Sequence, residues 1–149
     1  NIITLAWVGT VCSNPPMISI SIRPSRYSHG IISASKEFII NIPDEEMIKA
    51  CDFCGAKSGR DFDKFKELGL TKEKGFVVNC PMIKECPINI ECKVKQVIHL
   101  GTHDMFIGEV VRVNANEEVI YSDGDIDYER INVVSYLMDN YFKNILIKK

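Results

Sequence analysis

The chain has 149 residues, of which 46% are hydrophobic and 26% are charged, and its formal net charge is −2. This composition is that of a globular protein and excludes a largely disordered one. A general nucleic-acid binder would carry a basic excess, and a membrane-spanning helix would need roughly 20 apolar residues in a row. The sequence has neither, so we expect one domain over residues 1–149 that acts on neither nucleic acid nor a membrane.

The first part of the chain predicts two paired strands, then a helix and a third strand. Residues 2–7 are rich in β-forming side chains, and the Gly-, Asn- and Pro-containing segment 9–16 predicts a loop. The segment 17–22 alternates apolar and hydroxyl side chains, which is typical of a strand with one buried face. A short helix is expected over 28–36 and a strand over 37–42. Because the chain begins inside the first of these strands, we expect a preceding N-terminal strand to be missing from the sequence.

Two further helices are expected in the middle of the chain. Asp44 is a good N-cap for the first, and the segment 58–61 introduces the second, which Gly69 ends. The side chains expected to face the core from the second helix are Phe62, Phe65 and Leu68. A short strand is expected over 76–78.

The second half of the chain predicts mostly sheet. Residues 88–95 alternate between apolar and polar side chains, residues 101–104 predict a turn, and residues 105–113 predict a long strand that completes a hairpin. The chain is then rich in Asp, Gly and Asn, which predicts a loop with a short strand at 119–121. Apolar residues near helical spacing predict a helix over 133–146. Many short strands with a few inserted helices favour an antiparallel barrel or sandwich.

The turn that ends the 17–22 strand gathers side chains that suit a phosphate. Arginine offers a forked and permanently charged set of donors, and hydroxyl groups add shorter hydrogen bonds. A helix that begins directly afterwards would add its free backbone N–H groups. The side chains concerned are Arg23, Ser25, Arg26, Tyr27 and Ser28. The pattern alone also fits a strand end with solvated arginines, and both interpretations stay open at this point.

The six cysteines support a rival hypothesis. Cys51 and Cys54 have the spacing of a metal or redox site, and Cys80, Cys86 and Cys92 follow at intervals of six. A zinc site usually combines two closely spaced pairs, whereas this chain has one. We therefore expect buried free thiols, no bound metal and a reducing, cytoplasmic location. A thiol-based redox or metal module built on Cys51 and Cys54 is the alternative.

Common catalytic motifs are absent from the sequence. It contains no Gly-x-Ser-x-Gly elbow, no phosphate-binding Walker loop and no Gly-x-Gly-x-x-Gly turn. A nicotinamide cofactor would therefore not be held by a Rossmann unit. Of the three histidines, His29 falls in the first helix beside the candidate phosphate site, His99 in a strand and His103 in a turn.

Seven segments in series carry a resemblance to a known family. They are 1–7 (NIITLAW), 14–17 (NPPM), 21–28 (SIRPSRYS), 38–43 (FIINIP), 58–65 (SGRDFDKF), 85–92 (ECPINIEC) and 101–110 (GTHDMFIGEV). In these segments the chain resembles the flavin reductase-like family, specifically its flavoredoxin branch. The similarity covers most of the chain and weakens after about Val113.

The resemblance implies a fold and an activity. The fold is a mainly β, antiparallel, Greek-key FMN-binding split barrel with inserted helices, normally a homodimer with the flavin near the subunit interface. The function implied is an FMN-binding oxidoreductase that uses NAD(P)H to reduce flavin or ferric acceptors through bound FMN. An electron carrier of the flavoredoxin type, reduced by a partner protein, is the alternative.

The resemblance also assigns roles to residues. The cofactor-binding set is Asn1, Thr4, Ala6, Trp7, Ser21, Arg23, Arg26, Tyr27, Ser28, Asn41, Ser58, Gly59, Asp63 and Lys64. Residues 4–7 would line the isoalloxazine ring, residues 21–28 would take the phosphate, and residues 58–64 would lie near the flavin edge or the dimer contact. His103 is the candidate catalytic residue, beside the nicotinamide or flavin face. Cys12 departs from the family's usual polar residue at its position.

Overall fold

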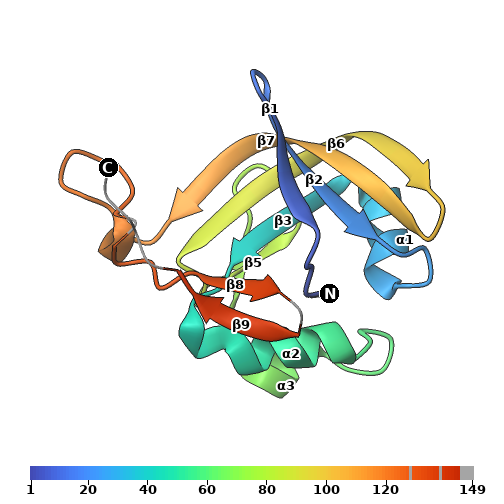
Figure 1. Ribbon diagram of the computed structural model, residues 1–149, viewed down its shortest axis with the longest axis horizontal. Helices are drawn as coiled ribbons and strands as arrows, with labels where there is room; N and C mark the ends of the chain where they lie inside the picture. Colours follow the sequence, from blue (N-terminus) through green and yellow to red (C-terminus); the bar gives the residue numbers. More distant parts are fainter. Residues whose placement is uncertain (128, 138, 145–149) are drawn as a thin grey trace.

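The computed structural model describes residues 1–127, 129–137 and 139–144. Its centre is a five-stranded sheet with the strand order β1-β2-β7-β6-β3 (Figure 1). The strands are β1 (Val8–Ser13), β2 (Pro16–Ile22), β3 (Glu37–Ile42), β6 (Ile88–Leu100) and β7 (His103–Ala115). Every neighbouring pair is antiparallel, which confirms the prediction of a mainly antiparallel β-fold.

The long hairpin of β6 and β7 carries the rest of the sheet. Its ladder runs from the pair Ile88–Ala115 to the pair Leu100–His103, and β2 and β3 pair on its two outer edges. The register shifts twice along β6, after Glu91 and after Val94. Such bulges bend and twist a strand, which accounts for the strong curvature of these two strands in Figure 1.

The start of the chain differs from the prediction. Residues 2–7 form no strand, and the segment 9–16 is not a loop, because β1 occupies it up to Ser13 and β2 begins at Pro16. The apolar side chains of residues 2–7 are used in packing instead: Ile3 and Leu5 lie against the core beneath the sheet. This stretch therefore crosses from the sheet to the helices, and its β-forming residues contact the core without joining a ladder.

Three α-helices are described: α1 (Tyr27–Ser35), α2 (Ile48–Ala56) and α3 (Lys64–Leu68). The expected helix over 28–36 is confirmed. The Asp44 side chain accepts a hydrogen bond from the Glu46 amide and begins the 3₁₀ turn Glu45–Met47 that leads into α2. Gly69 ends α3 with φ of 64°, as expected of a residue in the left-handed region.

The inward-facing side of α3 was only partly predicted. Phe65 is buried, but Phe62 is 36% exposed, so its predicted core position is wrong. Phe62 precedes the helix and instead contacts the ring of Phe53 on α2, edge to face, with ring centroids 5.8 Å apart. Helical spacing does not apply to a residue before the N-cap, which here is Asp63.

The main core lies between the sheet and α1. Its buried members are Ile20, Ile22, Ile32, Phe38, Cys92 and Phe106. Gly108 on β7 makes room for the Phe38 ring, because a Cβ at this position would lie 2.5 Å from the Phe38 Cζ atom. A second cluster joins α3 to the segment before β6 and consists of Met47, Phe65, Ile83 and Cys86.

A buried carboxylate holds the loop before β5. The short strands β4 (Lys72–Lys74) and β5 (Pro81–Ile83) pair with each other, and the predicted strand over 76–78 is a loop. The Glu91 side chain, fully buried, accepts hydrogen bonds from the amides of Phe76, Val77 and Val78 at 2.8–3.1 Å and from the Asn114 side chain at 2.9 Å. The loop amides thus bond a side chain instead of a neighbouring strand.

The last described segment is a hairpin, where a helix over 133–146 was predicted. Strands β8 (Val134–Leu137) and β9 (Asn140–Lys143) pair antiparallel, with Asp139 at positive φ in the turn; residues 138, 145 and 146 lie outside the described residues. The hairpin lies beside α2 (Figure 1), where the Tyr141 hydroxyl donates to Asp52 at 2.7 Å. Of the apolar residues near helical spacing, Val134, Leu137 and Tyr141 therefore lie on the strands of this hairpin.

The strand expected at 119–121 is also wrong. The segment Glu117–Val119 is a 3₁₀ turn, and Ile120 forms only an isolated bridge with Ile126. Among the described residues, no helix has the length and apolar character needed to cross a membrane.

Glu91 gives the fold a testable dependence on pH. Burial alone would raise the pKa of Glu91, but the hydrogen bonds from Asn114 and the three loop amides outweigh it and hold the pKa below its ordinary value. In the variant Glu91→Gln, one carboxylate oxygen becomes an NH2 group. This donor would face the N–H groups that now donate to Glu91. We expect the free energy of unfolding at neutral pH to fall by about 1–3 kcal/mol, measured by urea denaturation.

The Glu91 carboxylate contributes fully to the free energy of unfolding above the ordinary glutamate pKa of about 4.3. This contribution is lost as the pH falls from there through the lower pKa of the folded state. The difference in stability between the native protein and Glu91→Gln should therefore shrink below that pH. The matched control is Glu73→Gln, on the exposed strand β4. A difference that stays constant down to pH 3 would contradict the role of the carboxylate.

Candidate functional site

The first turn of α1 is an exposed set of donors at the end of β2. Arg26 is the N-cap residue with an extended backbone, and its side chain makes no capping hydrogen bond. The N–H groups that begin a helix point outward without intrahelical acceptors and carry partial positive charge. The buried Ser28 hydroxyl accepts a hydrogen bond of 2.7 Å from the Asn1 side chain. The expected succession of a strand and a helix around residues 23–26 is therefore present, and the phosphate site itself stays a prediction.

The loop of residues 58–63 packs directly on this turn. A Cβ added to Gly59 would lie 1.9 Å from the Asn1 Oδ1 atom and 3.1 Å from the Tyr27 ring, so a larger residue there would displace the Asn1 side chain. The Arg60 guanidinium lies 5.3 Å from the centre of the Tyr27 ring and donates to the Ser25 carbonyl oxygen at 3.4 Å. The two segments, about 30 residues apart in sequence, thus form one surface.

A cleft of about 340 Å³ opens where these segments meet. Its walls include Asn1, Tyr27 and Gly59, and three cationic side chains lie along it: Arg60, Lys64 and Lys72. The acidic residues on its wall are Asp61 and Asp63. Since Asp63 caps the first turn of α3, one of these two carboxylates is already engaged with a backbone amide.

Lys64 is the buried cation of the cleft. Its side chain, 4% exposed, donates to the carbonyl oxygens of Ile2 at 2.6 Å and Cys54 at 2.7 Å. Burial lowers the pKa of Lys64, and the positive charge of Arg26 acts in the same direction. An ammonium group has three donors, of which these carbonyls take two. Lys64 therefore joins residues 1–7 to α2 and brings positive charge to the cleft.

A second, mainly apolar cavity of about 380 Å³ lies beneath residues 1–5. Two predicted site residues on its wall make structural contacts. The Thr4 hydroxyl donates to the Cys51 carbonyl oxygen on α2, and the Asn41 side-chain oxygen accepts from the Ile83 amide at 3.0 Å. These contacts tie the opening segment and β3 to their neighbours.

His103 lies in a small cluster at the start of β7. Its ring is 4.4 Å from the Trp7 ring and tilted by 49°, and its Nε2 atom accepts from the Arg23 Nε group at 3.4 Å. The Thr102 hydroxyl is 2.9 Å from the other ring nitrogen. Trp7 is 60% exposed, and its carbonyl oxygen accepts from the Ser21 amide at 3.2 Å, which holds it beside the end of β2. Four predicted residues thus come together here.

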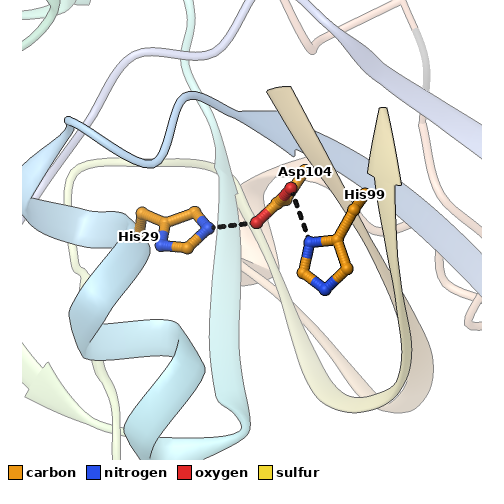
Figure 2. Close-up of polar contacts among 3 residues, drawn as sticks. All are labelled: His29, His99 and Asp104. Carbon is orange, nitrogen blue, oxygen red and sulfur yellow. Dashed lines mark hydrogen bonds and ion pairs between the residues drawn. The ribbon is translucent and has the colours of Figure 1, made fainter. Parts of the chain in front are cut away.

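Asp104 contacts two further histidines, His29 and His99 (Figure 2). The two carboxylate oxygens lie 2.7 Å from His29 Nε2 and 2.8 Å from His99 Nδ1. Hydrogen bonds from His99 and His29 hold the pKa of Asp104 below its ordinary value. Sequence reasoning missed this group, because His29 and Asp104 are 75 residues apart and no local pattern joins them.

The cysteines are all free. Burial raises the pKa of Cys51 to about 11 and those of Cys86 and Cys92 to about 12, and it also raises the pKa of Cys54 and of Cys80. A protonated thiol is a poor nucleophile and a poor metal ligand. Within the described part of the chain, no group of three or more His, Cys, Asp or Glu side chains is arranged to hold a metal ion. The geometry thus gives the thiol-module hypothesis no support.

The structure sorts the predicted site residues into three places. The cationic cleft contains Asn1, Tyr27, Gly59, Asp63 and Lys64. The apolar cavity contains Asn1, Thr4, Ser28 and Asn41. The surface around His103 contains Trp7, Ser21 and Arg23, while Ala6 and Arg26 are exposed and Ser58 accepts from the Arg60 amide. Arg60 and Lys72 were not predicted; Arg60 falls inside the 58–65 segment and could have been included for its charge.

The donor set at the cleft suits a phosphorylated ligand. A helix N-terminus, a buried lysine and an arginine stacked on tyrosine are groups that bind phosphate oxygens. The phosphate of a flavin mononucleotide fits the chemistry of these residues.

Known structures share this fold over nearly the whole chain. Flavoredoxin of Desulfovibrio vulgaris (Miyazaki F) is 34% identical, with a TM-score of 0.91, and the match covers 99% of this chain and 81% of that one. Flavoredoxin from Methanosarcina acetivorans is 29% identical, with a TM-score of 0.89 and coverage of 97% and 77%. High molecular weight rubredoxin of Moorella thermoacetica is 30% identical over 102 residues, which are 67% of this chain and 43% of that protein.

The antiparallel sheet, its inserted helices and these matches define a split-barrel flavoprotein, as the sequence predicted. The family model for the flavin reductase like domain matches residues 1–130. The chain belongs to this family.

Gly59 provides a test of the contact between the two segments. Gly59→Ala would force the Asn1 side chain away and break its hydrogen bond to Ser28. We expect the free energy of unfolding to fall by about 1–3 kcal/mol, measured by thermal denaturation, with loss of the Asn1–Ser28 contact in a crystal structure. The control is Gly30→Ala in α1, where a Cβ meets nothing within 4 Å and should stabilise the helix. Equal stability of both variants would contradict the steric argument.

Proposed function

We propose that the chain is an FMN-dependent oxidoreductase that uses NAD(P)H to reduce a free flavin or a ferric acceptor. One observation carries the proposal: the N-terminus of α1 and the 58–63 loop meet in a cationic cleft, and Arg23, in the turn before α1, contacts His103 of the exposed Trp7–His103 pair. A phosphate group and a flat aromatic ring system need these two environments close together. When bound, FMN supplies hydride acceptance and one-electron transfer.

The residues of the cleft and of the 23–28 turn bind the phosphate end. In this proposal the first-turn amides of α1 and the Ser28 hydroxyl donate to phosphate oxygens, and Arg23 and Arg26 supply charge from the turn. Tyr27 stacked beneath Arg60 forms the wall, and Lys64 adds its remaining donor. Ser58, Gly59 and Asp63 shape the loop that brings Arg60 to the turn.

The residues around His103 bind the ring end. Thr4, Ala6 and Trp7 line the isoalloxazine with backbone and small side chains, and Ser21 holds Trp7 in place through its amide. Asn41 lies on the wall of the apolar cavity nearby. His103, oriented by Arg23 and Thr102, contacts the nicotinamide or flavin face. The exposed Trp7 surface is where a second copy of the chain would cover the ring in a homodimer.

An electron carrier reduced by a partner protein is the second candidate function. The similarity to two flavoredoxins and to a high molecular weight rubredoxin favours it. Both candidates use the same FMN site and differ only in the electron donor. Six free cysteines suit the reducing cytoplasm proposed for either function.

The visible absorbance of the purified protein separates these candidates. We expect a flavin spectrum, either as purified or after addition of FMN, that bleaches when NADH or NADPH is added without oxygen. Bleaching only after addition of a reduced partner protein would establish the carrier function instead. A colourless protein that does not bind added FMN would refute both.

Arg23 tests the phosphate assignment. Arg23→Ala should weaken FMN binding by about 1–3 kcal/mol, measured by calorimetric titration, because a charged hydrogen bond is lost. The matched control is Arg112→Ala near the other end of β7, where the guanidinium lies 4.3 Å from the centre of the Phe76 ring. Unchanged affinity in Arg23→Ala, or equal losses in both variants, would exclude Arg23 from the phosphate site.

A further inference from the structure

Asp104 occupies a buried position near the start of β7, the middle strand of the sheet. It faces Ile22 on β2 and His99 on β6 in the two ladders. Its side chain is 9% exposed, and each carboxylate oxygen has its own imidazole partner (Figure 2). The partners differ in setting, since the His29 side chain is 16% exposed and that of His99 is 80% exposed. The more buried partner, His29, comes from the helix α1, whereas His99 belongs to the sheet.

His29 belongs to the first turn of α1 and follows Ser28 directly. Its amide donates to the Arg26 carbonyl oxygen at 3.0 Å, which closes that turn. Its ring meets the edge of the fully buried Phe106 ring, with centroids 5.1 Å apart and planes at 70°. The imidazole is therefore held between a core aromatic ring and a carboxylate, and both belong to β7.

A nine-residue helix cannot fix its own orientation, because helices of this length are marginal without tertiary contacts. The buried apolar contact of α1 comes from Ile32, one turn further along. The polar contact between His29 and Asp104 fixes the first turn itself. The same turn presents the amides and the Ser28 hydroxyl that the proposed function assigns to the phosphate.

We propose that Asp104 is a positioning residue that acts through His29: it holds the first turn of α1 in the orientation that binds phosphate, and so sets the preference for FMN over riboflavin. Riboflavin has the same ring system and lacks the phosphate. The inference rests on the proposed FMN site, and it concerns residues that do not themselves touch the ligand.

The test compares FMN with riboflavin in paired variants. Asp104→Ala removes the carboxylate. His29→Phe keeps an aromatic ring beside Phe106, removes the hydrogen bond and leaves Asp104 with His99. In both variants we expect the Kd for FMN to rise about tenfold or more, since a hydrogen bond to a charged group is lost, while the Kd for riboflavin changes less than about threefold. His99→Gln, which alters the exposed partner, should leave the ratio of the two constants within about threefold of the native value.

The conservative variant Asp104→Asn distinguishes positioning from charge, because its side-chain oxygen still accepts from the imidazole. It should restore most of the FMN preference lost in Asp104→Ala. Equal weakening of FMN and riboflavin, or an unchanged ratio in His29→Phe, would overturn the inference. A native protein that binds FMN no better than riboflavin would instead refute the phosphate site on which the inference rests.

Discussion

The pairing of β6 with β7 is the constraint on which the rest of the molecule depends. Each strand has 13 residues, and the neighbouring strands β2 and β3 pair with the two outer edges of this ribbon. The ribbon also carries a buried carboxylate toward each end. Glu91 on β6 binds a loop through its amides, and Asp104 on β7 binds a helix through an imidazole. Segments that have no ladder partner are thus fixed to the sheet by charge-assisted hydrogen bonds.

Local chemistry made much of this fold predictable from the sequence. The clean alternation of residues 88–95 identified β6, and the caps at Asp44 and Gly69 placed helix boundaries correctly. The errors fell where a segment's partners are distant. Residues 2–7 have strand propensity, but they contact helices and the core, and the tail's apolar spacing suits a helix as well as a short hairpin. Propensity gives way to tertiary packing in both cases.

The candidate site shows the same division. The turn of residues 23–28 was recognisable because its donors are adjacent in sequence. Its junction with Gly59 and Arg60 depends on a contact between distant segments, which the sequence did not predict. The His29–Asp104–His99 group had no signal at all, because three separate elements contribute one residue each. Sites built from one turn are readable in a single sequence, and sites built by topology are not.

In the loop bound by Glu91, exposed side chains are combined with backbone amides that are not free to bond water. Phe76 is 69% exposed and Val77 is 43% exposed, so these two side chains face solvent. Their amides, however, end on an anion that is fully buried in β6. Solvent deuterium can replace those amide protons only when the bonds to Glu91 open. Exchange at Phe76, Val77 and Val78 therefore reports how often this loop separates from the central sheet, although all three residues lie outside the sheet.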